Sequence, residues 1–149
     1  MTEPLPQRFR VGAYGLLREA DRVLVTRTRT RLGALLNFPG GAVELGEGTT
    51  AAVRREFLEE TGTAVAVGAL AYVTEGYHRS EAYPENQLVK IYWSVERVGP
   101  QLPWPAGNGD DVEACLWLTV AELLAPGLVP SLTASDREMV QGLRDRGVW

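Results

Sequence analysis

The stretch from Gly41 to Gly62, GAVELGEGTTAAVRREFLEETG, holds the most informative pattern in this chain of 149 residues. Within it Glu56, Glu59 and Glu60 are spaced i, i+3, i+4 along a predicted helix. At ~100° per residue they share one face, where like charges weaken a helix by roughly 0.2–0.5 kcal/mol per pair. A divalent cation turns that repulsion into coordination, because Mg²⁺ takes oxygen ligands and bridges carboxylates to phosphates. The pattern therefore predicts a metal site that serves phosphate chemistry.

Neighbouring residues favour this interpretation over a solvated acidic face, which is the commoner origin of glutamate-rich helices. Val53 and Phe57 form an apolar stripe that places the carboxylates at the border of the buried face. Arg55 lies one turn before Glu59, at the spacing of a salt bridge. The preceding segment 38–41, FPGG, combines a rigid turn with two residues that have no side chain. Such a backbone can approach a ligand closely.

These residues resemble the Nudix box, G-x5-E-x7-R-E-U-x-E-E-x-G-U, in which U is a bulky apolar residue. The matching positions are Gly41, Glu47, Arg55, Glu56, Phe57, Glu59, Glu60 and Gly62. Two positions depart from the pattern, because Thr63 replaces the final apolar residue and Leu36 replaces an aromatic residue before FPGG. Neither departure removes a charged group. The chain is therefore identified as similar to MutT-like, single-domain members of the Nudix hydrolase family.

The resemblance implies a metal-dependent pyrophosphohydrolase that cleaves a nucleoside diphosphate linked to another moiety, X. Candidate substrates are ADP-ribose, nucleotide sugars, dinucleoside polyphosphates and nucleoside triphosphates, and the implied cofactor is Mg²⁺ or Mn²⁺. By the same resemblance, Glu56 and Glu60 are expected to bind the metal directly. Glu59 is expected to be a third ligand or the catalytic base. The backbone carbonyl of Gly40 is a further expected ligand, since carbonyl oxygens are hard donors.

Two other charged residues of the box are expected to support the catalytic group. Arg55 would orient Glu59 or Glu47 rather than contact substrate, and Glu47 would hold Arg55 or an outer metal ion. Some family members also recruit an acid from a loop. Six acids are candidates here, and their spacing does not choose among them: Glu75, Glu81, Glu85, Asp110, Asp111 and Glu113.

Arg27, Arg29 and Arg31 are candidate substrate-binding residues at the end of a strand predicted over 23–30. Alternation places all three on one side if the strand stays extended. The planar guanidinium suits phosphate oxygens or a sugar carboxylate. The alternative is an ordinary solvated strand end.

Aromatic residues of the polar segment 75–86 are candidates for contact with a nucleobase. Tyr77, with His78 and Tyr83, would stack on the base, although an ordinary exposed loop is the alternative. Trp104, between two prolines, is interpreted as an anchor of a long surface loop rather than a substrate lid.

Hydrophobic periodicity predicts an α+β fold with strands first, a helix in mid-chain, more strands and a terminal helix. Strands are expected over 9–18, 23–30, 63–74, 87–95 and 114–118, and loops over 32–41, 75–86 and 99–111. One helix is expected to begin at a cap of Gly48 or Thr49 and to end before Gly62, and a brief helix is expected from a cap at Thr119 through Leu124. A final helix is expected to begin within 130–136, where Thr133 and Asp136 resemble a capping box, and to run to about Arg146. The resemblance makes this a Nudix-type α/β/α sandwich, in which a mixed β-sheet lies between the box helix and the C-terminal helix.

Composition sets the remaining expectations. A length of 149 residues with 45% hydrophobic content predicts one globular domain over 1–149. The net charge of −4 gives no reason to expect a nucleic-acid or membrane partner. The N-terminus has no signal-peptide pattern, and the single cysteine, Cys115, lies in an apolar run, so a reducing, cytoplasmic location is expected. A homodimer is the default expectation, because many family members dimerise.

Two other functions fit the same family. One is a non-catalytic Nudix domain that binds a nucleotide ligand as a sensor. Such regulators often lose box residues and carry a DNA-binding domain, whereas this chain keeps its charged box residues and has no length for a second domain. The other is isomerisation of a prenyl diphosphate, which requires a reactive cysteine. Cys115 in an apolar segment is a poor candidate for that role.

Overall fold

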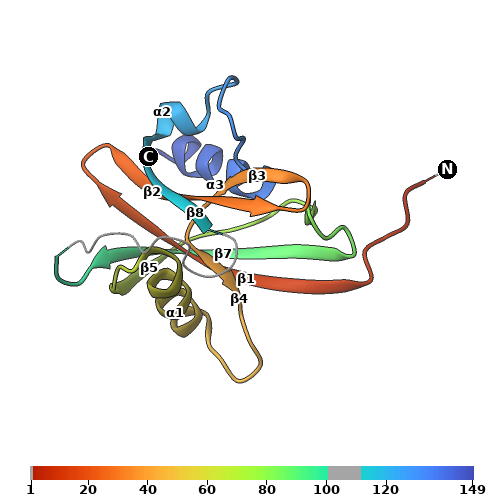
Figure 1. Cartoon of the computed structure of the whole chain (residues 1–149), viewed down its shortest axis with the longest axis horizontal. Helices are drawn as coiled ribbons and strands as arrows, with labels where there is room; N and C mark the ends of the chain where they lie inside the picture. The colour runs from red at the N-terminus through yellow and green to blue at the C-terminus, as the bar shows by residue number, and fades with distance from the viewer. Residues whose placement is uncertain (1, 101–111) are drawn as a thin grey trace.

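The computed structural model describes residues 2–100 and 112–149, which form eight strands and three helices (Figure 1). In chain order these are β1 (Arg8–Glu19), β2 (Arg22–Thr30), β3 (Gly33–Asn37), β4 (Gly40–Ala42), α1 (Thr49–Thr61), β5 (Val65–Val73), β6 (His78–Arg79), β7 (Asn86–Arg97), β8 (Val112–Thr119), α2 (Val120–Leu123) and α3 (Ala134–Asp145). Trp104, Asp110 and Asp111, three candidates from the sequence, lie outside the described residues.

The strands pair into one mixed sheet. Its main order is β3-β2-β1-β7-β5, while β4 pairs with β1, β6 with β7 and β8 with β2. β1 and β7 run parallel from the pair Arg8–Asn86 to the pair Leu17–Val95, and the other pairings are antiparallel. The mixed sheet that the sequence predicted is therefore confirmed.

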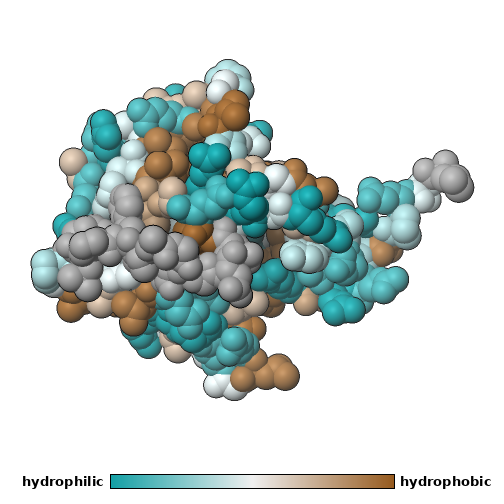
Figure 2. All heavy atoms as spheres, viewed as in Figure 1, coloured by the Kyte–Doolittle hydropathy of each residue, from teal (hydrophilic) through white to brown (hydrophobic). Residues whose placement is uncertain are grey.

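Alternate residues of β1 contribute to two hydrophobic cores on opposite faces of the sheet. On one face, Ala13 and Leu17 belong to a core with Phe57 of α1. On the other face, Tyr14 belongs to a core with Met139 of α3. The sheet therefore lies between the box helix and the C-terminal helix, as Figure 1 shows, which confirms the predicted α/β/α arrangement. Side chains on the face seen in Figure 2 are mostly hydrophilic, as expected when apolar residues fill two internal layers.

The box helix α1 has the ends that the sequence predicted. Gly48 is its N-cap, and Gly62 ends it in the left-handed conformation, with φ of 68° and its N–H bonded to the carbonyl of Leu58. α1 packs closely on the sheet because β1 has Gly15 beneath it, where a Cβ would lie 2.7 Å from the ring of Phe57. Burial of Phe57 stabilises this contact by roughly 1.5–3 kcal/mol.

Two segments expected to be loops contain strands, so those expectations were wrong. The segment 32–41 contains β3 and the start of β4, and the segment 75–86 contains the two-residue β6. The glycines of β4 have low strand propensity, and they become a strand only because β1 pairs with them from a distant part of the sequence.

Candidate functional site

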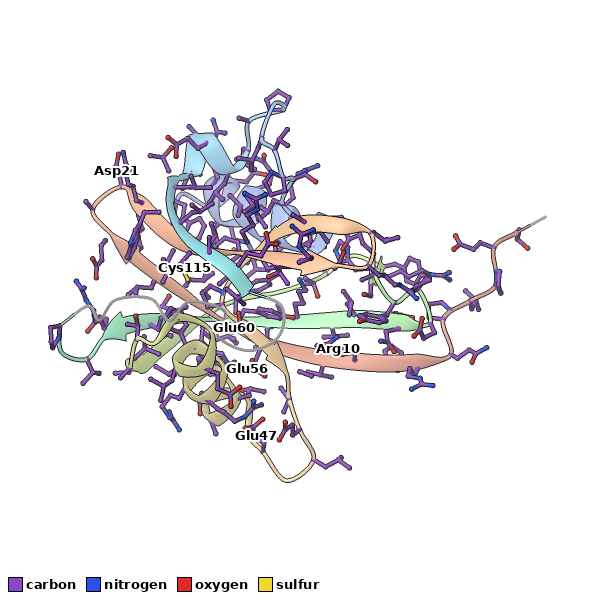
Figure 3. The ribbon with its side chains drawn as sticks, in the orientation of Figure 1. Arg10, Asp21, Glu47, Glu56, Glu60 and Cys115 are labelled. Atoms are coloured by element: carbon purple, nitrogen blue, oxygen red, sulfur yellow. The ribbon has the colours of Figure 1, made fainter. Side chains whose placement is uncertain are left out.

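The residues of the box meet the sheet at a cavity of about 640 Å³. Glu56, Glu59 and Glu60 of α1 and the glycines of β4 line it on one side. The remaining lining comes from β1, β2, β3, β7, β8, the segment 80–83 and single residues between these elements. Figure 3 shows Glu56 and Glu60 directed from α1 toward the sheet, with Glu47 at the loop that precedes the helix. The cavity has the size of a typical small-ligand site.

Glu56 and Glu60 form a contacting pair of carboxyl groups. Burial raises the pKa of Glu60 to about 9, and the charge of Glu56 and a hydrogen bond between the two carboxyl groups act in the same direction. A hydrogen bond from the Gly40 backbone has the opposite, smaller effect. Glu56 also lies against Gly41, where a Cβ would be only 2.8 Å from its carboxyl carbon. Two carboxyl groups in contact present the oxygen donors that a hard divalent cation would take.

Arg55 connects the carboxyl pair to the loop before α1. Its Nε donates to Oε2 of Glu47 at 2.7 Å, and its Nη2 donates to Oε1 of the same carboxylate at 2.9 Å. Its Nη1 donates to Glu56 at 2.9 Å and to Glu59 at 3.4 Å. The hydrogen bonds from Arg55 and one from the Glu44 backbone lower the pKa of Glu47 to about 2. Arg55 therefore keeps Glu47 ionised and fixes the orientation of Glu56.

Glu59 stands apart from the carboxyl pair. Its side chain is 57% exposed, and Arg55 is its ion-pair partner. Across residues 2–100 and 112–149, no three His, Cys, Asp or Glu side chains are gathered closely enough to hold a metal by themselves. Magnesium does not need such a cage, because it usually takes one or two carboxylates and keeps water and substrate phosphates as its other ligands. The pair Glu56–Glu60, beside the Gly40 backbone, fits that requirement.

Arg27 and Arg29 of β2 and Arg31, which follows the strand, do not have equivalent positions. Arg29 and Arg31 line the cavity, whereas Arg27 does not. Arg27 and Arg29 both form ion pairs with Glu113, the former at 3.3 Å, and the guanidinium of Arg31 lies 5.0 Å from the centroid of the Tyr83 ring. Pairing of β2 with β8 is irregular here, because Arg27 faces Ala114 and the next residue faces Val112, which leaves Glu113 as the extra residue of β8. Arg27 and Arg29 therefore lie on one side of β2, as the sequence predicted, and share Glu113 as a partner.

Tyr77 lies away from the cavity. Its hydroxyl accepts hydrogen bonds from Arg79 at 3.3 and 3.2 Å, and both residues border a separate surface depression with Glu3. Tyr83, a few residues further on, is the aromatic residue of this segment that lines the cavity. The short strand β6, absent from the sequence prediction, separates the two tyrosines and directs them to different places.

The loop acids also divide by position. Glu81 lines the cavity and accepts a hydrogen bond from the Ala134 backbone at 3.1 Å. Glu75 forms an ion pair with Arg146 at 2.9 Å instead. Glu85 does not line the cavity, and Glu113 is held by the arginines of β2. Glu81 is thus the described loop acid best placed to meet a ligand.

The cavity residues that were not identified from the sequence include Arg10, Tyr14 and Lys90. Lys90 is buried, and its Nζ lies 3.0 Å from Asp136 and 4.7 Å from the centroid of the Tyr14 ring. Burial opposes the charge of Lys90, but Asp136, Tyr14 and Glu81 together outweigh that effect, so the pKa of Lys90 is raised. The alternation of β7 could have indicated from the sequence that Lys90 and Tyr92 share one face of the strand. The sequence contained no indication that β1 pairs in parallel with β7 and so brings that face to the cavity.

The comparisons with known proteins agree with the fold and the box. The NUDIX domain model matches residues 6–143, so the chain belongs to the Nudix family. It is accordingly a hydrolase that acts on acid anhydrides of phosphorus-containing substrates. Across the described residues, no helix is long and apolar enough to cross a membrane.

The chain is similar to several named proteins. It is 29% identical over 122 residues to the 8-oxo-dGTP diphosphatase of Escherichia coli (strain K12), which covers 80% of this chain and 87% of that protein. A MutT protein from Methanosarcina mazei Go1 has a similar structure, with a TM-score of 0.76, 20% identity and coverage of 98% and 99% of the two chains. For a MutT NUDIX hydrolase from Burkholderia pseudomallei the TM-score is 0.70, with 25% identity and coverage of 89% and 96%.

Proposed function

We propose that this protein is a divalent-metal-dependent pyrophosphohydrolase that cleaves nucleoside diphosphate derivatives. The observation that carries the proposal is the carboxyl pair Glu56–Glu60, held by Arg55 at one side of a cavity that also presents cationic side chains. A bound Mg²⁺ would neutralise phosphate charge and activate water. The acidic side of the cavity suits the ion, and the cationic side suits the polyanionic substrate.

The box residues then have distinct tasks. Glu56 and Glu60 hold the ion with the Gly40 carbonyl, and Arg55 keeps Glu56 in position. Glu59 lines the cavity without contacting the pair, so it is proposed to accept the proton of the attacking water. Water attacks one phosphorus of the pyrophosphate, the bridging P–O bond breaks, and two phosphorylated products leave.

The other side of the cavity would bind the nucleotide. Arg29 and Arg31 line it and are proposed to contact phosphate or sugar oxygens. Tyr83, already against Arg31, offers a face on which a base can stack. Arg27 and Tyr77 are not included, because neither lines the cavity. The similarity to an 8-oxo-dGTP diphosphatase supports a nucleotide substrate. The free thiol of Cys115 suits the cytoplasm as the place of action.

Cys115 does not support the isomerase alternative. Its side chain is buried in the core beneath α1, and burial raises the pKa of its thiol to about 11. It does not line the cavity. A thiol in that environment stays protonated at neutral pH and is a weak nucleophile.

A hydrolysis panel tests the proposed function. The wild-type protein is incubated with ADP-ribose, nucleotide sugars, diadenosine polyphosphates and nucleoside triphosphates, with Mg²⁺, Mn²⁺ or EDTA, and product masses are read directly. Glu60→Gln removes one carboxylate from the pair, and Glu96→Gln at an exposed position of β7 is the matched control. We expect metal-dependent cleavage by the wild type and by Glu96→Gln but not by Glu60→Gln.

Two results would overturn the proposal. Cleavage by Glu60→Gln at the wild-type rate would remove the carboxyl pair from the mechanism. If the wild type binds a nucleotide in a metal-dependent manner but cleaves none, the result would instead favour a non-catalytic Nudix domain that acts as a nucleotide sensor.

A further inference from the structure

Arg10 of β1 lines the candidate cavity and is half-buried (Figure 3). Within the described part of the chain, its guanidinium forms no hydrogen bond and no ion pair. The other three cations of the cavity wall, Arg29, Arg31 and Lys90, are engaged with Glu113, Tyr83 and Asp136 respectively. Arg10 is thus the cavity cation whose charge the described residues leave uncompensated.

An uncompensated arginine in a concave wall indicates an anionic ligand. A guanidinium stays charged at every physiological pH, and partial burial without a counter-ion is unfavourable. Its planar fork of N–H donors matches a phosphate or carboxylate through two parallel hydrogen bonds. The cavity acids Glu56, Glu59, Glu60 and Glu81 do not lie within ion-pair distance of it.

Arg10 is displaced along β1 from the carboxyl pair. β1 pairs with β4 so that Ala13 faces Gly41 and Tyr14 faces Gly40, which places Glu56 and Glu60 level with residues 13 and 14. Arg10 is three to four residues away, or about 10–13 Å between Cα positions at ~3.3 Å per residue. The Arg10 backbone is therefore offset along the cavity wall from the carboxyl pair, and its side chain is available to a part of the substrate beside the pyrophosphate.

The Tyr14 side chain lies between these two positions. A Cβ on Gly12 would be 2.6 Å from the Tyr14 hydroxyl oxygen, so the ring lies back along β1 toward Arg10. The phenolic hydroxyl of Tyr14 can donate a hydrogen bond to an anionic ligand. Arg10 and Tyr14 together offer N–H and O–H donors at this end of the cavity.

We propose that Arg10 binds an anionic group carried by the moiety X, so that the enzyme prefers nucleoside diphosphate derivatives whose X is itself charged. The anion is a further phosphate, as in a nucleoside triphosphate or dinucleoside polyphosphate, or the carboxylate of a nucleotide uronate. The inference rests on the proposed pyrophosphohydrolase function. It divides the candidate substrates into a charged class and a neutral class, the latter including ADP-ribose and neutral nucleotide sugars.

Matched substrate pairs test the proposal. In each pair the nucleoside diphosphate is the same, and X is charged in the first member and neutral in the second. The pairs are ATP and ADP-ribose, GTP and GDP-mannose, and UDP-glucuronate and UDP-glucose. The specificity constant kcat/KM is measured for wild type, Arg10→Ala, Arg10→Lys and Arg8→Ala, an exposed arginine of the same strand. We expect Arg10→Ala to lower kcat/KM at least tenfold for charged X, mainly through KM, and less than twofold for neutral X. Arg10→Lys should retain part of the preference, and Arg8→Ala all of it.

Three results overturn the proposal: an equal loss for both members of a pair, no loss for either, or a loss that follows guanine rather than the charge of X. Thermal melting of each variant shows whether a loss of activity comes from a folding defect. Arg10→Lys is the conservative control, because it keeps the positive charge and most of the side-chain volume. If the wild type hydrolyses none of these substrates, the proposed function fails. Binding of an anionic group by Arg10 is then still tested by calorimetric titration. Adenosine 5′-(β,γ-imido)triphosphate should then bind wild type at least tenfold more tightly than Arg10→Ala, and equal binding or none overturns the inference.

Discussion

Arg55 and Glu47 are joined by two parallel hydrogen bonds of 2.7 and 2.9 Å, across a loop of the box that separates them by eight residues. The remaining Nη1 donor of Arg55 contacts Glu56. One guanidinium therefore fixes the loop before α1 and a carboxylate of the proposed metal pair at the same time. Because both carboxylates depend on its planar geometry, a charge alone cannot replace it.

Arg55→Lys should impair catalysis while the fold is kept. Lysine retains the positive charge but cannot reach Glu47 and Glu56 together. Loss of a group that orients a metal ligand typically costs about 10–100-fold in activity or metal affinity, and we expect that range in kcat/KM. Arg54→Lys, at the exposed neighbouring position of α1, is the matched control. Equal activity of the two variants would mean that the orientation of Glu56 does not depend on Arg55.

Gly41→Ala should displace Glu56 from the carboxyl pair. A Cβ at this position would lie 2.8 Å from the Glu56 carboxyl, closer than real Cβ contacts permit. We expect kcat/KM to fall by at least about tenfold, which corresponds to ~1.4 kcal/mol of lost transition-state stabilisation. Gly48→Ala introduces the same methyl group where nothing lies within 4 Å, and it should change activity little. Full activity of Gly41→Ala would contradict the assigned position of Glu56.

Metal binding should release a proton from Glu60. Because the pKa of Glu60 is raised to about 9 in the metal-free fold, this carboxyl is protonated at pH 7, and a cation must displace that proton. Metal affinity should therefore rise with pH up to about 9 and then level off. Calorimetric titration with Mg²⁺ or Mn²⁺ in buffers of different ionisation enthalpy measures the proton count. We expect close to one proton per ion for wild type and none for Glu60→Gln, and proton-free binding by wild type would exclude Glu60 as a ligand.

Glu138 should stabilise the fold in a pH-dependent manner. Burial opposes its charge, but hydrogen bonds from the Glu75 and Gly76 backbone and from His78 lower its pKa to about 2. The pKa of a glutamate in an unfolded chain is about 4.3, so the stabilisation is complete above that pH and is lost as pH falls toward about 2. We expect on the order of 2 kcal/mol at pH 7.

Urea unfolding of wild type and Glu138→Gln between pH 7 and pH 2.5 measures this contribution. The difference in free energy of unfolding between the two proteins should shrink as the pH is lowered. The exposed variant Glu96→Gln should follow the wild type throughout. A difference that stays constant with pH would show that the charge of Glu138 is not responsible.

The sequence predicted those features that depend on residues within a single helix. The C-terminal end of α1 follows from Gly62, because glycine adopts the left-handed conformation without steric cost. The N-cap of α3 at Thr133 was also predicted, and the Thr133 hydroxyl accepts the backbone N–H of Asp136. Proximity of Arg55 to the box glutamates follows from helical spacing as well.

Features that depend on distant partners were not predictable from one sequence. β4 and β6 are too short to show a hydrophobic period, and they exist because β1 and β7 pair with them. Arg10 and Lys90 share the cavity only because β1 and β7 are parallel neighbours, with Arg10 beside Leu88 and Gly12 beside Lys90. Parallel pairing between strands so far apart leaves no local mark in the sequence.

The position of the bound metal tests the central claim most directly. Crystals grown with Mn²⁺ are measured near the manganese absorption edge, and an anomalous difference map locates the ion. We predict a peak within about 2.0–2.6 Å of carboxylate oxygens of both Glu56 and Glu60, the range of hard-cation ligands, and none at that place in Glu60→Gln. An ion bound elsewhere in a protein that hydrolyses its substrate would contradict the account.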